Sequence, residues 1–314
     1  MAGSFARSLE SLILTQGVVY GLGFITFYYP VLSMLNEWWI ARKGLAYGLM
    51  CSASGVSGAI WPSAIQAALN RYGYPTTLRA IAVGLCLVTG PLIPLIRGRV
   101  PETTAGAASR TDWTFLRASL FWVYSASNFA MGLGFFFPSL YVPSYATSNG
   151  LTATQGALLL TMMSVSQVCG QLGFGYLSDR KVPLESLAGS SMIIAGIAVF
   201  ACWGLARTFG ILALFCIVYG FFGAGYTALW GRMGTAVSQD PNAAFAAFGL
   251  LNVGKGVGNV LAGPISGALL QRTVIVGSYG ASKYHAVVLF SGSCLALSAT
   301  IIPVSYALRW HRSE

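Results

Sequence analysis

Charged residues are scarce in this sequence. Asp, Glu, Lys and Arg together make up 8% of the 314 residues, whereas hydrophobic residues make up 55%. Soluble domains carry about a quarter charged residues, so a soluble fold of this length is excluded: it has too little polar surface to cover its apolar side chains. The apolar runs are long and continuous, unlike the short alternating segments of a membrane β-barrel. The sequence therefore predicts an all-α polytopic membrane protein.

Histidine is nearly absent, and cysteine shows no paired spacing. The two histidines lie at an expected helix start (His285) and in the C-terminal tail (His311), and the six cysteines all lie within apolar runs. No group of His, Asp or Cys has the spacing of a metal site or of an activated nucleophile. The cysteines are typical of small core residues. We therefore expect no enzyme, no metal site and no cofactor.

Basic residues outnumber acidic ones by 18 to 8, which gives a net charge of +10. They are spread over short loops and form no Arg/Lys-rich block, so nucleic acid is not an expected partner. The N-terminus lacks a basic stretch followed by an apolar core and a small-residue cleavage site, so no signal peptide is predicted. The partner that this pattern indicates is the lipid bilayer.

Nine apolar segments are long enough to cross a bilayer as helices. They lie at about 12–35, 45–69, 77–97, 119–145, 153–175, 184–206, 209–231, 243–270 and 284–308. The loops on one side hold eleven Lys and Arg residues, and those on the other hold five, or six with Arg7. By the positive-inside rule the richer side faces the cytoplasm, which predicts an external N-terminus and a cytoplasmic C-terminus.

The polar stretch from Arg97 to Arg117 is the longest interruption between these segments. We therefore expect a partial N-terminal bundle of three spans at 1–97, a cytoplasmic linker at 98–118 and a six-helix bundle at 119–314. An internal repeat supports this division. The motif Tyr20-Gly-Leu-Gly23 recurs as Tyr219-Gly-Phe-Phe-Gly223, and further motifs of the first three segments recur in the last three at a similar offset.

The string Gly175-Tyr-Leu-Ser-Asp-Arg180 resembles the Gly-x-Leu-x-Asp-Arg loop signature of the major facilitator superfamily. The stretches Trp38–Gly48, Phe137–Ala146 and Gly263–Gly267 resemble fungal monocarboxylate-transporter-like proteins of that superfamily. The resemblance implies the major facilitator fold, with two six-helix halves built from inverted three-helix units. On that plan the chain supplies family helices 4 to 12. Its N-terminal bundle is then incomplete, an N-terminally truncated form is expected, and the string is the signature copy between helices 8 and 9.

Lys255 is the one ionisable side chain near the middle of a predicted span. A charge at that depth is costly unless it is partnered. At 100° per residue Asn252, Lys255 and Asn259 share one polar face, which indicates a face toward a cavity and makes them candidate substrate-binding residues. No acidic residue lies mid-span, so Lys255 is neutralised by burial, pairs with an anionic substrate, or is partnered by the missing helices. A structural lysine that donates to backbone carbonyls is the alternative.

Polar and aromatic side chains of two other segments complete the candidate substrate site. Gln167 and Gln171 share a helix face in segment 153–175, and Asn128 and Tyr141 lie in segment 119–145. Animal monocarboxylate transporters resemble the first stretch but carry an aspartate and an arginine, tied to proton coupling, where this chain has the two glutamines. The difference argues against proton-coupled lactate transport. The alternatives are amides that hold helices together and aromatic residues of the core or the membrane interface.

The signature loop also predicts a contact on the cytoplasmic side. By the pseudo-symmetry of the two halves, Asp179 is expected near the positive N-terminal end of the helix that begins at Gly44. Arg42 and Lys43 are expected beside it, and Arg180 belongs to the same loop. Together these residues are predicted to act as a conformational latch.

These observations favour a secondary transporter of a small organic solute, with a monocarboxylate or a related organic anion as the leading class and a proton as a candidate coupling ion. The resemblance implies alternating access between two bundles. The alternatives are a membrane scaffold or sensor that has lost transport, and an inactive fragment of a transporter. We expect a multi-pass protein of the plasma membrane rather than of an internal membrane.

Overall fold

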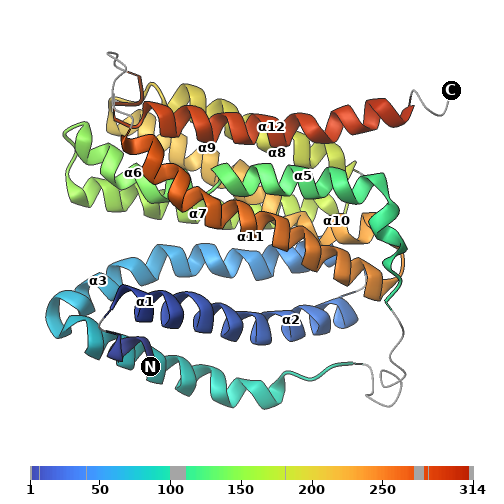
Figure 1. The fold of residues 1–314 in the computed structure, drawn as a ribbon, viewed down its shortest axis with the longest axis horizontal. Coiled ribbons are helices and arrows are strands. Elements are labelled where there is room, and N and C mark those ends of the chain that lie inside the picture. Colours follow the sequence, from blue (N-terminus) through green and yellow to red (C-terminus); the bar gives the residue numbers. More distant parts are fainter. Residues whose placement is uncertain are drawn as a thin grey trace. The chain divides into compact units, whose positions relative to one another are not determined.

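The computed structural model describes residues 2–6, 8–39, 41–99, 111–180, 182–271, 279–281 and 283–310. Side chains are described at these positions except 62, 63, 66 and 304–310. Within these ranges the chain folds into helices and their connections, and no β-strand occurs (Figure 1). The predicted all-α class is confirmed.

The chain divides into two compact units. The first comprises Met1–Ala41 and Ile60–Ser109, and the second comprises Arg42–Ala59 and Arg110–Glu314. Segment 42–59 thus groups with the C-terminal helices. The three-part division at residues 97 and 118 stays a prediction.

The first unit is built from η1 (Ala2–Phe5), α1 (Leu9–Leu12), η2 (Ile13–Val19), α2 (Tyr20–Trp38), the later part of α3 (Lys43–Thr89) and η3 (Gly90–Leu95). A capping box between Ser8 and Ser11 begins α1, because each side chain satisfies a free backbone amide of the other. The C-terminal end of α2 is tied to the segment after η3. The indole nitrogen of Trp38 donates to the carbonyl of Arg97 over 3.1 Å, and Glu37 accepts from the amide of Arg99 over 2.8 Å.

Helix α3 is interrupted at Gly73, where φ is 74° and ψ is 170°. This backbone conformation is open to glycine and strained for other residues. The interruption falls between the two predicted segments 45–69 and 77–97. The sequence therefore placed this break correctly.

The second unit contains the first part of α3 and all later elements. These are η4 (Trp113–Arg117), α5 (Ser119–Gly134), α6 (Phe137–Ser148), α7 (Ala153–Ser178), α8 (Leu184–Ile197), the π-helical η5 (Ala198–Trp203), α9 (Phe209–Ala228), α10 (Trp230–Val237), α11 (Pro241–Gln271), η6 (Tyr279–Ala281) and α12 (His285–Trp310). Helix α7 begins at a capping box between Thr152 and Gln155. Before η4, Asp112 accepts hydrogen bonds from the amide and hydroxyl of Thr114, which lower the pKa of its carboxyl group.

Within the described ranges, eight helical segments are long and apolar enough to cross a membrane. They are Leu9–Trp38, Ala67–Leu95, Ser119–Ser148, Ala153–Ser178, Leu184–Trp203, Phe209–Val237, Pro241–Gln271 and His285–Pro303. Each corresponds to a predicted segment. The remaining prediction, 45–69, is helical as the first part of α3 but is not among the eight. Eight of the nine predicted spans are thus confirmed by length and apolar character, and the ninth is confirmed only as a helix.

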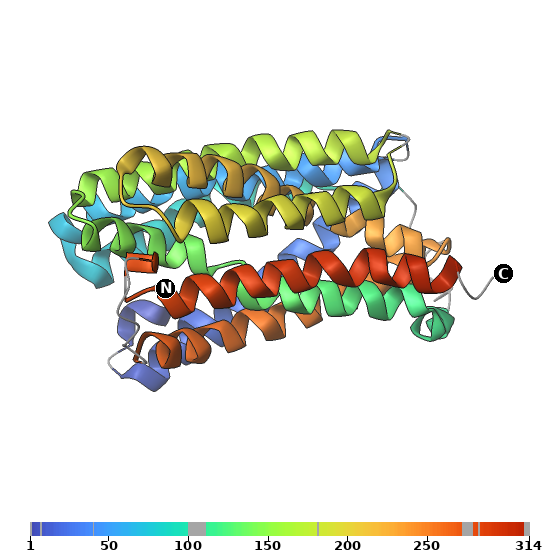
Figure 2. The same ribbon diagram turned by 90° about the horizontal axis from the view of Figure 1, so that it is seen from above.

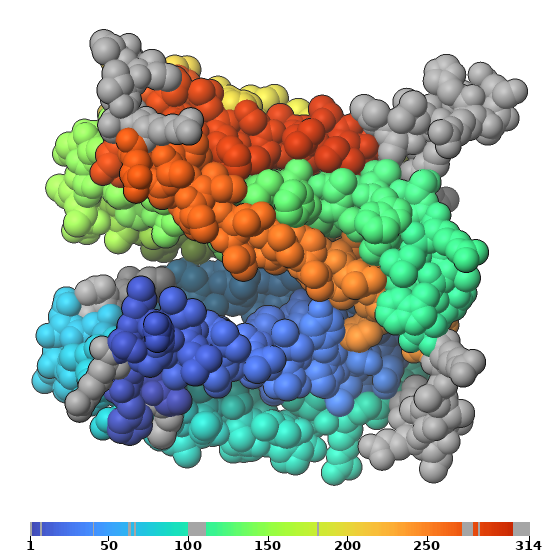
Figure 3. Space-filling model, viewed as in Figure 1, coloured from blue at the N-terminus to red at the C-terminus, as the bar shows by residue number. Residues whose placement is uncertain are grey.

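Packing in the second unit centres on two helix contacts. Helix α7 lies against α9, and α5 lies between α11 and α12. Figure 2 shows α12, in red, alongside α5, in green, and the space-filling view shows the side chains of α5, α11 and α12 in contact on one face (Figure 3). These contacts bring α3, α5, α10 and α11 to the positions from which the candidate site is built.

Candidate functional site

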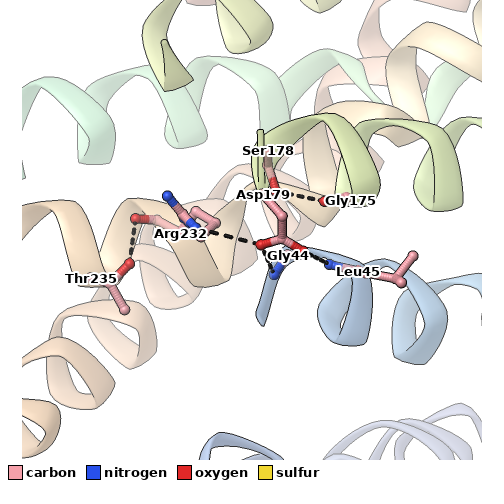
Figure 4. Close-up of polar contacts among 7 residues, drawn as sticks. All are labelled: Gly44, Leu45, Gly175, Ser178, Asp179, Arg232 and Thr235. Carbon is pink, nitrogen blue, oxygen red and sulfur yellow. Dashed lines mark hydrogen bonds and ion pairs between the residues drawn. The ribbon is translucent and has the colours of Figure 1, made fainter. Parts of the chain in front are cut away.

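Asp179 joins the end of α7 to the start of α3 (Figure 4). One carboxylate oxygen, Oδ1, accepts from the amide of Gly44, and the other, Oδ2, accepts from the amide of Leu45, each over 2.7 Å. These are free amides of the first helical turn, and the helix dipole favours a negative charge there. The predicted position of Asp179 is therefore confirmed, while its action as a latch stays a prediction.

Small residues allow this contact. A Cβ atom added to Gly44 would lie 2.6 Å from the carbonyl oxygen of Gly175, and one added to Gly175 would lie 2.6 Å from that of Gly44. One turn further along α3, a Cβ atom added to Gly48 would likewise overlap the backbone of Gln171. The backbones of α3 and α7 therefore touch, as small-xxx-small positions permit in membrane helices.

The ionic partner of Asp179 comes from an unpredicted position. The guanidinium of Arg232 on α10 lies 3.5 Å from Asp179 Oδ1, the one ion pair found in the part of the chain that the structure describes. Arg180 turns back to its own helix, where it bonds the hydroxyl of Tyr176 and covers its ring at 4.7 Å. Arg42 and Lys43 precede the amides that Asp179 binds, but neither forms an ion pair with it.

A second cluster surrounds Lys255, near the middle of α11. The amine Nζ lies 3.8 Å from the ring centroid of Trp230, the first residue of α10, in a cation–π contact. Cys51 of α3 lies near Lys255. Among the described residues no carboxylate forms an ion pair with this amine.

Helix α5 closes this cluster from another side. A Cβ atom on Gly132 would lie 2.6 Å from the carbonyl oxygen of Lys255, so α5 and α11 are in backbone contact. The amide nitrogen of Asn128 donates to the carbonyl of Tyr124 over 2.9 Å and lies 3.9 Å from the sulfur of Met233 on α10. Asn128 is almost fully buried. The predicted residues Asn128, Lys255 and Asn259 thus come from helices that pack against one another.

The other predicted binding residues are placed differently. Asn252 donates to the carbonyl of Phe248 in its own helix over 2.9 Å. Gln171 donates to Thr227 of α9 over 3.1 Å, and Gln167 is partly buried one turn earlier on α7. Tyr141 packs with the rings of Phe137 and Tyr284, at centroid distances of 6.1 and 6.0 Å, and not with Lys255. The structure therefore does not assemble all seven residues in one place.

The family sequence model described as Major Facilitator Superfamily matches residues 124–313 of this chain. This chain belongs to the major facilitator superfamily. The family inferred from the signature loop is thereby confirmed, and with it the all-α membrane fold, whose members are secondary transporters with binding sites near the bilayer midplane. Lys255 lies near the middle of the Pro241–Gln271 span, and Trp230 lies in the last third of the Phe209–Val237 span.

Several named members of the superfamily are similar to nearly the whole chain. The MFS-type transporter pynF of Aspergillus niger is 28% identical over 308 residues, which is 97% of this chain and 68% of the relative. Monocarboxylate transporter 12-B of Danio rerio is 28% identical, over 95% of this chain and 69% of the relative. The Fujikurins efflux protein of Gibberella fujikuroi is 26% identical, over 96% and 63%. The chain thus spans about two thirds of the length of these superfamily members.

Sequence reasoning missed three residues of these superfamily sites. The sequence patterns assigned no site role to Arg232, Trp230 or Ser125. Leu229 separates α9 from α10 but keeps a helical backbone conformation, so Trp230 lies within the continuous span Phe209–Val237. No group of three or more His, Cys, Asp or Glu that could hold a metal ion occurs within the described ranges.

Proposed function

We propose that this protein transports a small organic anion by alternating access, with Lys255 as the residue that binds the anion. The observation that carries the proposal is a cation near the middle of a span with no carboxylate paired to it among the described residues. An intramembrane charge is retained when it serves a substrate or ion pathway. The relatives named as monocarboxylate transporters support an organic acid as the substrate class.

The transport movement would take place between the bundle at 1–97 and the bundle at 119–314, joined by the linker at 98–118. Asp179 would stabilise one end state by its hydrogen bonds to the start of α3. A proton is the candidate coupling ion, although Gln167 and Gln171 stand where animal relatives carry the pair tied to proton coupling, and the plasma membrane is the proposed location. Uptake measured with and without a protonophore tests the first, and microscopy of the tagged protein tests the second.

Replacing Lys255 with glutamine is the central test. Lys255→Gln should reduce uptake of radiolabelled organic acids, such as pyruvate, lactate and benzoate, to the level of cells that lack the protein. Lys255→Arg should restore only part of the uptake, because the planar guanidinium does not replace a compact ammonium in a shaped site. The measurement is uptake in cells that express the protein, normalised to its amount in the membrane, together with a melting curve.

The matched control is Lys283→Gln, which removes an exposed lysine beside Tyr284. It should leave uptake unchanged. If Lys255→Gln lowered the melting temperature but the surviving protein took up the acids with normal affinity, Lys255 would be a structural residue and the proposal would be wrong. A protein that neither binds nor transports any of the acids would favour the scaffold or sensor instead.

A further inference from the structure

Buried polar atoms without a partner are concentrated around Lys255. Six buried side-chain nitrogen or oxygen atoms of the described residues have no hydrogen-bond partner: Ser125 Oγ, Asn128 Oδ1, Gln171 Oε1, Trp203 Nε1, Trp230 Nε1 and Asn259 Oδ1. Four of the six belong to α5, α10 and α11. Such atoms are rare in folded proteins because each loses its hydration without compensation. Their concentration at one helix junction therefore needs an explanation.

The three helices meet in pairs at this junction. Helices α5 and α11 are in backbone contact at Gly132, and a Cβ atom on Gly254 would lie 3.7 Å from the carbonyl oxygen of Ser125. Helices α5 and α10 meet where Asn128 approaches Met233. Helices α10 and α11 meet where Lys255 covers the ring of Trp230. Ser125, Asn128, Trp230 and the lysine amine thus lie around a single junction inside the second unit, and Asn259 follows Lys255 by about one turn of α11.

Two of these groups need an acceptor. The Lys255 ammonium and the Trp230 indole N–H are donors only. The indole nitrogen belongs to the ring system whose face the ammonium covers at 3.8 Å. The two nitrogens are then roughly 4–5 Å apart, a separation that one carboxylate bridges with hydrogen bonds of ordinary length. A carboxylate is therefore the group that satisfies both donors.

Two other groups need a donor. The orientation of the Asn128 amide is set by its hydrogen bond to the Tyr124 carbonyl, which leaves Oδ1 as a free acceptor. Asn259 Oδ1, one helical turn from Lys255, is likewise a free acceptor. The Ser125 hydroxyl serves as donor or acceptor. An ionised monocarboxylate without other polar groups has no hydrogen-bond donor for these oxygens, whereas a hydroxyl group on the ligand donates to them.

We infer that the ligand of this junction is a hydroxycarboxylate, whose carboxylate binds Lys255 and Trp230 and whose hydroxyl donates to Asn128 or Asn259. The inference rests on the proposed function and narrows its substrate class. The unpartnered atoms are enclosed in this conformation, so the ligand binds in a different conformation of the transport cycle, in which the junction is accessible. The bound hydroxyl group then donates a hydrogen bond to an oxygen that has no partner in the closed state. The affinity for a hydroxylated acid is therefore higher than the affinity for its unsubstituted counterpart.

Pairs of acids that differ by a hydroxyl group provide the test. Binding of lactate and glycerate is compared with that of propionate, and binding of 4-hydroxybenzoate with that of benzoate, by thermal shift and by radioligand binding to the purified protein. We expect a hydroxy acid to bind at least about tenfold more tightly than its counterpart in one or more pairs. If the two acids of every pair bind with equal affinity, the inference is overturned and the proposed function still stands. If none of them binds, both are overturned.

Three variants separate the roles of the junction. Trp230→Phe keeps the aromatic face but removes the donor, so both acids of a pair should bind about tenfold more weakly. Asn128→Leu and Asn259→Leu should weaken only the hydroxy acid and bring the ratio within a pair close to one. The Oδ1 atoms that these substitutions remove have no partner, and the one strong hydrogen bond that Asn128→Leu loses lies within α5, so these variants should fold.

The chain offers a matched control for the tryptophan. Trp203 is also fully buried with an unpartnered indole nitrogen, but it stacks on Phe215 and contacts Tyr145. Trp203→Phe should leave the affinity for every acid unchanged. Equal effects of Trp203→Phe and Trp230→Phe on affinity, or a Trp230→Phe protein that binds normally but melts earlier, would show that Trp230 is a packing residue.

Discussion

Gly170→Ala is expected to destabilise the protein by about 3 kcal/mol or more, equivalent to a fall of roughly 5–10 °C in melting temperature. A Cβ atom at this position would lie 2.7 Å from the carbonyl carbon and 2.8 Å from the Cα of Phe221, and closer still to its carbonyl oxygen. All three are backbone atoms of α9, so no side-chain rotation relieves the overlap. The methyl group must push α7 and α9 apart along the main helix contact of the second unit.

Gly173→Ala is the matched control on the same helix. Its Cβ atom would approach only ring atoms of Phe221, the nearest at 3.6 Å, which is an ordinary van der Waals contact. It should melt within about 1 °C of the parent, since substitutions without a structural consequence lie within about 0.5 kcal/mol. The readout is the melting temperature of both purified variants. Equal melting temperatures for the two variants would contradict the close packing at Gly170.

Asp179→Asn is expected to cost about 2–3 kcal/mol. The carboxylate accepts two hydrogen bonds, from the amides of Gly44 and Leu45. An asparagine accepts only one of them and turns an N–H group toward the other amide. The side chain of Asp179 is only 9% exposed, so water does not replace the lost bond. The ion pair with Arg232 contributes less, because it is long and the arginine is 40% exposed.

Asp240→Asn is the control for the loss of a carboxylate at a helix start. Asp240 accepts from the amide of Ala243 within its own helix over 2.8 Å, a role that asparagine fills equally well. It should leave the melting temperature nearly unchanged. The measurement also includes the balance of conformations, read by cysteine accessibility on the two sides of the membrane. If Asp179→Asn behaves like Asp240→Asn in both readouts, Asp179 is not a latch.

Much of the architecture was predictable from composition and from local patterns. Low charge and long apolar runs predicted helices that span a membrane, because every backbone polar group in a bilayer must be paired within the protein. Eight of the predicted spans have the required length and apolar character. The ninth, 45–69, is the exception among them. Ser52, Ser54 and Ser57 lower its apolar character, so hydropathy alone does not distinguish it from a helix inside the protein.

The signature string carried more information than composition did. Its aspartate lies at the start of α3, as the pseudo-symmetry of the repeat predicted. The ionic partner was not predictable in the same way. Arg42 and Lys43 are adjacent in sequence to the amides that Asp179 binds, but Arg232 approaches from α10 (Figure 4). Sequence proximity predicts which backbone is near, and only the packing of a third helix decides which side chain reaches the carboxylate.

The sequence by itself determined the membrane class, the superfamily, the helices and the unusual lysine of α11. The tertiary structure decided which groups face that lysine: Trp230, Ser125 and Asn128 lie at its junction, while Tyr141 does not. The physical reason is that lipid tails are as apolar as a helix interface, so hydrophobic periodicity does not reveal which faces of two membrane helices meet. Close contacts at glycines such as Gly132 and Gly258 set that pairing, and they bring together polar atoms that lie far apart in the chain.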